Sequence, residues 1–238
     1  MPLSLRRTGA VPLRIGHRGA AALAPENTLA SFAKALEIGV DGIEFDVVSG
    51  LGGLEIAHDA GIRGAPPLED ALTFFAERAT TIVQIDLKSS GHERQLVDAL
   101  RRHDLVDRTV VSSFRARALR AIAELEPALA RSFTYPEDRL GISRRRGLAL
   151  AVRGGLVAMR RILPRRIASM LDRAAASAVT LHFALVTPRV VRACHARGAA
   201  VWAWTVNDAA AAAGLAEAGV DAIISDDPRI FRRPSAEA

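Results

Sequence analysis

The sequence is poor in the residues that support disulfide scaffolds and base-stacking surfaces. Its single cysteine, Cys194, cannot form an internal disulfide and cannot build a cysteine metal cluster within one chain. Aromatic residues are also scarce, with two Trp, one Tyr and eight Phe, so stacking on nucleic-acid bases has little support. The net charge of +6 attracts anions but does not choose among them. We expect a protein of a reducing compartment that does not bind nucleic acid.

Long apolar runs are absent as well. Charge or glycine interrupts each run well before the length of a membrane span, and the first residues show no apolar segment with a cleavage site. Half of the residues are hydrophobic, which is enough to bury a sizeable core. A chain of 238 residues has the usual size of one α/β barrel. We therefore expect one domain over residues 1–238, located in the cytoplasm.

Short apolar runs alternate with stretches of helical period, which is typical of parallel βα units. Expected helices begin near Thr28, Leu68, Glu93, Ala116, Arg166, Pro188 and Asp208, and a short one follows Pro228. Eight runs qualify as strands, at residues 13–17, 42–47, 81–87, 109–113, 130–134, 178–182, 200–205 and 221–225. Eight such units predict an α/β protein folded as a single (β/α)8 TIM barrel.

Residues 139–173, between the fifth and sixth predicted strands, are rich in arginine and nearly free of acid. The segment is too long for an ordinary connection, so we expect an extra basic helical insertion. Three interpretations remain open: a helix on an anionic membrane, an arginine patch that receives phosphate, or a helix packed on the barrel. Peripheral contact with an anionic membrane is thus one expected property of this segment.

Carboxylates gather at the ends of two neighbouring strands. Glu44 and Asp46 face the same side of their strand because residues two apart do so, and Asp86 precedes Lys88 at the end of the next strand. Carboxylates crowded in this way repel each other unless a cation joins them. Oxygen ligands suit Mg2+ or Ca2+ better than zinc, so Glu44, Asp46 and Asp86 are the expected metal ligands.

Two histidines are expected beside these carboxylates. His17 ends the first strand, in Gly-His-Arg-Gly, and His58 follows the apolar residues 54–57. Imidazoles titrate near neutral pH, so such a pair can take a proton from a nucleophile and give one to a leaving alkoxide. Lys88 adds a cation that can stabilise a phosphoryl oxygen. His92, His103 and His195 lie on expected helices or at their starts and are expected to be structural.

The ordered blocks GHRGAAALAPENTLASF, GIEFDV, AHD, IDLK, WAWTVND and GVDAIISDDP resemble those of the glycerophosphodiester phosphodiesterase family over nearly the whole chain. This resemblance implies an α/β barrel that hydrolyses glycerophosphodiesters to sn-glycerol 3-phosphate and an alcohol. It implies His17 and His58 as the acid/base pair, with His17 as our choice of base. It also implies Arg18, Lys88 and Trp204 as substrate-binding residues, although Trp204 could equally be barrel core.

The chain departs from the family pattern at two places. Many relatives carry glutamate where this chain has Asp86, and many carry a larger insertion where residues 59–67 are brief. A more open pocket would admit lysophospholipids, so lysophospholipase D-type hydrolysis is one alternative. Another is a catalytically weak barrel that binds anionic lipid through residues 139–173.

Overall fold

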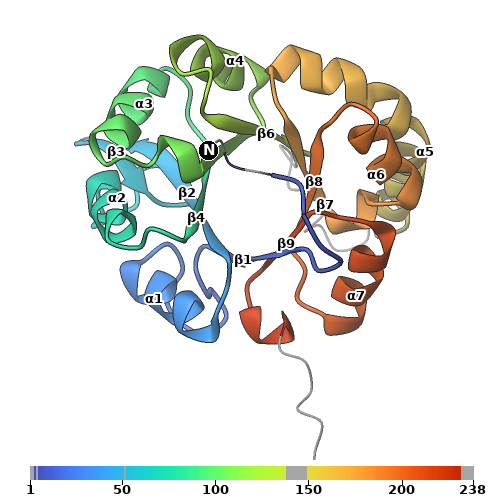
Figure 1. Cartoon of the computed structure of the whole chain (residues 1–238), viewed down its shortest axis with the longest axis horizontal. Coiled ribbons are helices and arrows are strands. Elements are labelled where there is room, and N and C mark those ends of the chain that lie inside the picture. The colour runs from blue at the N-terminus through green and yellow to red at the C-terminus, as the bar shows by residue number, and fades with distance from the viewer. Residues whose placement is uncertain (1–2, 4, 51, 138–148, 232–238) are drawn as a thin grey trace, which may run out of the picture.

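The computed structural model describes residue 3 and residues 5–50, 52–137 and 149–231, and eight of its strands close into a parallel barrel (Figure 1). The ring closes because the first strand pairs in parallel with both the second and the last. The barrel strands are β1 (Leu13–His17), β2 (Gly42–Gly50), β4 (Ile82–Leu87), β5 (Thr109–Ser113), β6 (Ala130–Tyr135), β7 (Ala178–His182), β8 (Ala200–Trp204) and β9 (Ala222–Ser225). The predicted TIM barrel is confirmed, with every expected strand in place.

One further strand was not expected. β3 (Gly53–Ile56) pairs antiparallel with the far end of β2 and forms a hairpin outside the ring. Only four residues long, it leads directly to His58. The hairpin therefore positions His58 at the rim of the barrel.

Helices cover the outside of the ring (Figure 1). They are α1 (Leu29–Ile38), α2 (Leu68–Ala76), α3 (Glu93–Arg102), α4 (Ala116–Leu125), α5 (Ala149–Ala174), α6 (Pro188–His195) and α7 (Ala209–Ala218). Local signals start and end them: the Thr28 side chain accepts from the Ser31 N–H in a capping box, and Gly39 and Gly219 end α1 and α7 in the left-handed conformation. Most of the core lies between these helices and the sheet.

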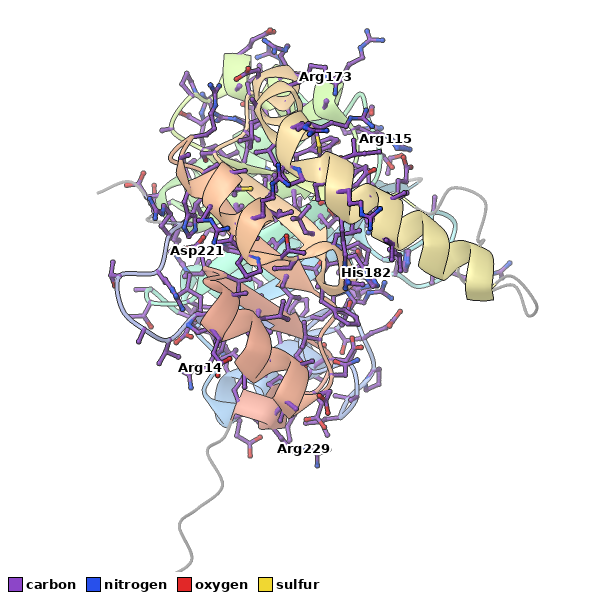
Figure 2. The ribbon with its side chains drawn as sticks, turned by 90° about the vertical axis from the view of Figure 1, so that its right-hand side faces the viewer. Arg14, Arg115, Arg173, His182, Asp221 and Arg229 are labelled. Atoms are coloured by element: carbon purple, nitrogen blue, oxygen red, sulfur yellow. The ribbon has the colours of Figure 1, made fainter. Side chains whose placement is uncertain are left out.

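The predicted basic insertion contains α5, which begins at Ala149, well before the expected start at Arg166. Pro164 lies inside it, and residues 139–148 of the insertion fall outside the described residues. Figure 2 shows α5 running along the barrel and extending past it on the side where His182 is labelled. Within the described residues, no helix combines the length and apolar character needed to cross a membrane.

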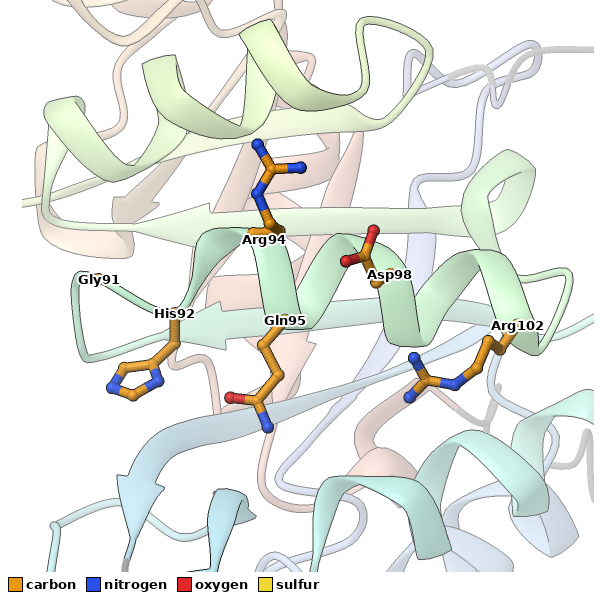
Figure 3. Close-up of a pocket in the computed structure, with 6 residues that line it drawn as sticks. All are labelled: Gly91, His92, Arg94, Gln95, Asp98 and Arg102. Atoms are coloured by element: carbon orange, nitrogen blue, oxygen red, sulfur yellow. The ribbon is translucent and has the colours of Figure 1, made fainter.

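The amino-terminal end of the barrel is closed by packing. Trp202 is fully buried in an apolar cluster with residues of other strands, such as Ile15 and Ala222, and its indole N–H donates to the Leu5 carbonyl at 3.1 Å. A hollow of about 460 Å³ on the outer side of α3 is lined by Gly91, His92, Arg94, Gln95, Asp98 and Arg102 (Figure 3). It contains none of the predicted site residues. The carboxyl ends of the strands are thus where function is to be sought.

Candidate active site

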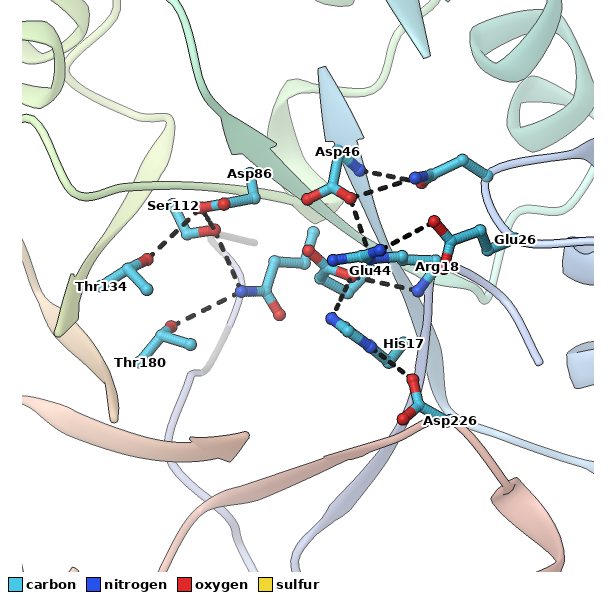
Figure 4. Close-up of polar contacts among 12 residues, drawn as sticks. His17, Arg18, Glu26, Glu44, Asp46, Asp86, Ser112, Thr134, Thr180 and Asp226 are labelled. Carbon is cyan, nitrogen blue, oxygen red and sulfur yellow. Dashed lines mark hydrogen bonds and ion pairs between the residues drawn. The ribbon is translucent and has the colours of Figure 1, made fainter. Parts of the chain in front are cut away.

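Strand register brings the predicted metal ligands together at the carboxyl end of the barrel. Asp46 of β2 stands opposite Asp86 of β4, and Glu44 stands opposite His17 of β1. One oxygen from each of Glu44, Asp46 and Asp86 lies within 4.8 Å of the others, and all three residues are buried. Figure 4 shows these side chains pointing into the barrel with His17 and Arg18. Parallel pairing thus converts sequence spacing into a carboxylate cluster.

The cluster is electrostatically strained without a cation. Burial, together with the nearby charges of Asp46 and Asp86, raises the pKa of Glu44 to about 7. Burial also opposes ionisation of Asp46, but Lys88 and Arg18 outweigh it and lower the pKa of this carboxyl. The Lys88 ammonium contacts Asp86 and lies 2.8 Å from Oδ1 of Asp46. Lys88 therefore balances part of the negative charge.

The residues present fit a divalent cation. Oδ1 of Asp46 is buried and has the Lys88 ammonium at 2.8 Å, without an aligned hydrogen bond. A buried carboxylate oxygen of this kind is normally satisfied by a hydrogen-bond donor or a metal ion. The donor set consists of hard oxygens, as Mg2+ and Ca2+ prefer.

Two hydroxyl groups donate hydrogen bonds to the Asp86 carboxylate. Its Oδ1 accepts from Ser112 at 2.9 Å and from Thr134 at 3.4 Å (Figure 4). Ser112 in turn accepts from the Gln84 amide at 3.1 Å. These contacts orient the short aspartate side chain and leave its other oxygen, Oδ2, facing Lys88. The polar layer was not anticipated from the sequence.

The loop after β1 fixes Arg18 and Asn27. Gly19 has φ +87°, and an added Cβ would lie 2.6 Å from a Ser31 backbone carbon, so only glycine fits the turn. The turn directs the Arg18 backbone N–H at Glu44 at 3.1 Å. Asn27 is buried and exchanges two hydrogen bonds with Asp46. It thus orders the loop against the cluster, while Thr28 caps the helix.

The Arg18 side chain lies between acidic groups. Its Nη1 donates to Glu26 at 2.8 Å, and its Nε lies 3.0 Å from Oδ2 of Asp46 without hydrogen-bond alignment. Burial opposes its charge, but Asp46 and Glu44 outweigh that effect and raise the pKa of the guanidinium. Arg18 therefore carries a permanent positive charge at the edge of the cluster.

His17 has a carboxylate partner on each side of its ring. Nδ1 lies 2.6 Å from Oδ1 of Asp226, just after β9, and Nε2 lies 3.8 Å from Oε2 of Glu44. Burial opposes protonation of His17, but Glu44 and Asp226 outweigh it and raise the pKa of the imidazole. Asp226 is itself held by Asn207, whose amide donates to Oδ2 at 2.6 Å. Neither Asp226 nor Asn207 was predicted as a site residue.

His58 occupies a different environment. Its side chain is 37% exposed, and its Nδ1 is buried without a hydrogen bond. Burial lowers the pKa of His58, and the nearby charges of Arg18 and Lys88 act in the same direction while Asp46 opposes them. The pKa of His58 is therefore below its ordinary value, and the side chain lies close enough to Arg18, Lys88 and Asp46 for their charges to act on it.

Trp204, the last residue of β8, is half-buried at the rim and also packs against the core cluster inside the barrel. Its indole N–H donates to the Thr180 carbonyl at 3.2 Å. Its ring meets the Phe114 and His182 rings edge to face, with ring centres 6.2 and 5.7 Å apart. The Lys88 ammonium lies 5.7 Å from the centre of the Phe114 ring. An aromatic wall thus borders the charged cluster.

Known proteins resemble the chain over nearly its whole length. The model of the glycerophosphoryl diester phosphodiesterase family matches residues 17–60 and 76–230. A glycerophosphodiester phosphodiesterase from Caldanaerobacter subterraneus subsp. tengcongensis is 27% identical, with 91% of this chain and 94% of that protein covered. The unmatched residues 61–75 include most of the brief connection after His58.

Solved structures agree with this result. A glycerophosphodiester phosphodiesterase from Parabacteroides distasonis superposes with a TM-score of 0.72 at 23% identity, covering 92% of this chain and 94% of that one. A phosphodiesterase from Oleispira antarctica, solved with the product sn-glycerol-3-phosphate, has a TM-score of 0.70 at 25% identity, with 92% and 94% covered. The chain therefore belongs to the glycerophosphoryl diester phosphodiesterase family, as its sequence blocks predicted, and is an enzyme of the phosphoric diester hydrolase class.

Proposed function

We propose that this chain hydrolyses glycerophosphodiesters to sn-glycerol 3-phosphate and an alcohol, using a divalent metal and two histidines. The observation that carries the proposal is the buried Glu44, Asp46 and Asp86 cluster with His17 beside it. The Oleispira antarctica relative, which holds sn-glycerol-3-phosphate, supports the same product here. We assign the activity to one domain over residues 1–238 in the cytoplasm, consistent with the single cysteine.

Glu44, Asp46 and Asp86 would hold Mg2+ or Ca2+. When bound, such an ion polarises a phosphoryl oxygen and neutralises charge that develops in the transition state. Arg18 and Lys88 add permanent cations at the same place, and we propose that they bind the remaining phosphate oxygens. Trp204 would provide an apolar wall for the glycerol or head group.

His17 is proposed as the general base. Because the Asp226 carboxylate can only accept, the close contact places the His17 proton on Nδ1 and leaves Nε2 free to take a proton. His58, at the exposed rim, would then protonate the leaving alkoxide. Without a metal, the raised pKa of His17 and the lowered pKa of His58 favour the opposite assignment, with His17 as the acid and His58 as the base. A cation beside Glu44 would oppose that charge on His17, so we retain His17 as the base.

Lysophospholipids are the second candidate substrates. The connection after His58 is short, and residues 59–64 are all exposed, so this segment does not pack over the barrel to enclose a leaving alcohol. A long acyl chain could leave through this side. Lysophospholipase D-type hydrolysis would then release lysophosphatidic acid.

The test measures release of sn-glycerol 3-phosphate from glycerophosphocholine and of lysophosphatidic acid from lysophosphatidylcholine, with Mg2+, Ca2+ or EDTA. We expect metal-dependent product that is lost in His17→Ala and retained in His103→Ala, since His103 pairs with Glu69 on the outside of the barrel. The preferred substrate identifies the leaving group. Equal product from His17→Ala, or from wild type in EDTA, contradicts the proposed use of His17 or of a metal. No product from either substrate with any metal favours a catalytically weak barrel that binds lipid.

A further inference from the structure

The two halves of α5 have different surroundings. From Leu163 onward the helix packs on the barrel through Leu163, Ile167, Met170 and Leu171, all buried. From Gly154 to Ile162 no side chain is fully buried, and Leu156 alone is half-buried against the core. Figure 2 shows this first half extending past the barrel, on the side of His182 and so of the active-site mouth. We call residues 154–166 the α5 overhang; the range takes in this exposed half, the first packed residue Leu163, and the exposed Arg165 and Arg166.

Exposed hydrophobic side chains concentrate on and beside the α5 overhang. Six large ones are exposed among the described residues, and four of them belong to this region: Val157, Met159, Ile162 and Phe183. Phe183 lies in the short helix η3 (Phe183–Leu185). This helix contacts α5 through a hydrogen bond from the Arg160 side chain to the Ala184 carbonyl. An exposed apolar cluster of this kind marks an interaction surface.

This apolar surface continues to the mouth of the barrel. The Phe183 and His182 rings are stacked, with their centres 4.7 Å apart. The His182 and Trp204 rings meet edge to face, with their centres 5.7 Å apart. The chain of contacts joins the α5 overhang to the aromatic wall of the candidate active site. A partner bound to the overhang would therefore lie next to the site that receives substrate.

The charge of the α5 overhang is entirely positive. Arg160, Arg161, Arg165 and Arg166 are exposed, and residues 139–171 contain no acidic residue. In the part of the chain that the structure describes, no carboxylate pairs with Arg161, Arg165 or Arg166. These arginines alternate with the exposed aliphatic side chains and do not form a separate face, so attraction to anionic lipid would supply most of the binding and the aliphatic side chains a smaller part.

We infer that the α5 overhang, together with Phe183, docks the barrel on bilayers that contain anionic phospholipid. The apolar side chains would enter the acyl boundary while the arginines meet lipid phosphates. Nucleic acid fits less well, because it offers nothing to exposed Val157, Met159 and Ile162 and the overhang presents no base-stacking aromatics. The docking itself does not depend on the proposed hydrolysis, but it would bring a lipid phosphodiester to the mouth.

The test is co-sedimentation of the full chain with vesicles of phosphatidylcholine alone or of an equal mixture with phosphatidylglycerol. We expect binding only to the mixed vesicles. Each arginine near an anionic surface contributes roughly fivefold, so the triple variant Arg161→Gln, Arg165→Gln, Arg166→Gln should partition about a hundredfold less. Val157→Ser with Ile162→Ser keeps the charge and should weaken binding roughly tenfold through lost apolar burial.

Two matched controls distinguish binding through the α5 overhang from binding caused by the overall positive charge or by any exposed apolar residue. The triple variant Arg94→Gln, Arg192→Gln, Arg197→Gln removes the same charge from other exposed positions, and Ile62→Ser removes an exposed aliphatic residue elsewhere. Both should bind like wild type. Equal loss in the control triple, equal binding to both vesicles, or binding to duplex DNA without binding to vesicles overturns the inference. Turnover of soluble glycerophosphocholine by the overhang variants should be unchanged, so failed docking and failed catalysis are distinguishable.

Discussion

Nδ1 of His17 lies 2.6 Å from Oδ1 of Asp226, which joins the first barrel strand to the loop after the last one. The contact fixes both the tautomer and the orientation of the ring, as a carboxylate does for a catalytic histidine in hydrolases. The His17 side chain is only 14% exposed, so this orientation is also enforced by packing.

Asp226→Asn tests this relationship. The amide can donate to Nδ1 and so stabilise the wrong tautomer, and we expect kcat for glycerophosphocholine to fall by roughly a hundredfold or more with little change in KM. Asp227→Asn is the matched control, because Asp227 pairs with Arg229 and does not contact His17. Steady-state kinetics of the two variants decide the matter, and an equal, small effect in both would contradict a positioning role for Asp226.

Asp226 also shows where prediction from the sequence ended. The spacing of Glu44 with Asp46, and of Asp86 with Lys88, predicted the cluster because strand periodicity is local and the neighbouring strands follow in chain order. The partner of His17 is 209 residues away and becomes a neighbour only when β1 pairs with β9. The pair Asp226-Asp227 at the end of the last predicted strand was the available signal. Once the barrel is assumed closed, a carboxylate there must face the first strand.

Other features depended on tertiary context. β3 was missed because four residues carry too little periodicity, and only its pairing with β2 makes it a strand. The early start of α5 was missed because the arginines and glycines before Arg166 show no regular apolar face, and the structure leaves this half exposed. The hydroxyls behind Asp86 come from β5 and β6, and no motif links them to the cluster.

The roles of the two histidines can be separated with a better leaving group. If His58 protonates the leaving alkoxide, His58→Ala should lose about a hundredfold or more on glycerophosphocholine but little on a p-nitrophenyl phosphodiester of glycerol, whose leaving group needs no proton. His17→Ala should be impaired on both substrates. Comparing kcat/KM for the two substrates in each variant provides the measurement. The opposite pattern would assign His17 as the acid and His58 as the base.

The Arg14 and Asp41 pair links the fold to pH away from the active site. Burial opposes ionisation of Asp41, but hydrogen bonds from Arg14 outweigh it and lower the pKa of the carboxyl. Because the folded pKa is depressed, this stabilisation is present above the ordinary aspartate value and is lost as pH falls through the folded pKa. Urea unfolding should show Asp41→Asn less stable than wild type at pH 7, with the difference beginning to shrink at about pH 4 and lost only below the depressed folded pKa. A difference that persisted in acid would contradict the assignment.

The two tryptophans should respond differently to the same substitution. Trp202→Phe removes the donor to the buried Leu5 carbonyl, so we expect unfolding free energy to fall by about 1–3 kcal/mol with little effect on KM. Trp204→Phe alters the rim beside Phe114 and His182 and removes the donor to the Thr180 carbonyl, so we expect a higher KM with a smaller loss of stability, because that hydrogen bond is only partly buried. Thermal melts and kinetics of both variants check this. A stability loss in Trp204→Phe equal to that of Trp202→Phe would mean that Trp204 is a core residue.

Metal binding should depend on the hydroxyl that holds Asp86. The Ser112 hydroxyl donates to Oδ1 at 2.9 Å, and removing such a contact behind a metal ligand commonly weakens metal affinity by roughly ten- to a hundredfold. We therefore expect Ser112→Ala to need more Mg2+ or Ca2+ than wild type for the same rise in melting temperature, a readout independent of turnover. Ser132→Ala is the matched control, because Ser132 is equally buried in the barrel but bonds Thr180 and not Asp86. If neither ion raises the melting temperature of wild type, while Asp46→Asn alone stabilises the chain, the carboxylates repel each other without holding a metal. If Ser132→Ala shifts the metal dependence as much as Ser112→Ala, the effect belongs to barrel packing and not to the orientation of Asp86.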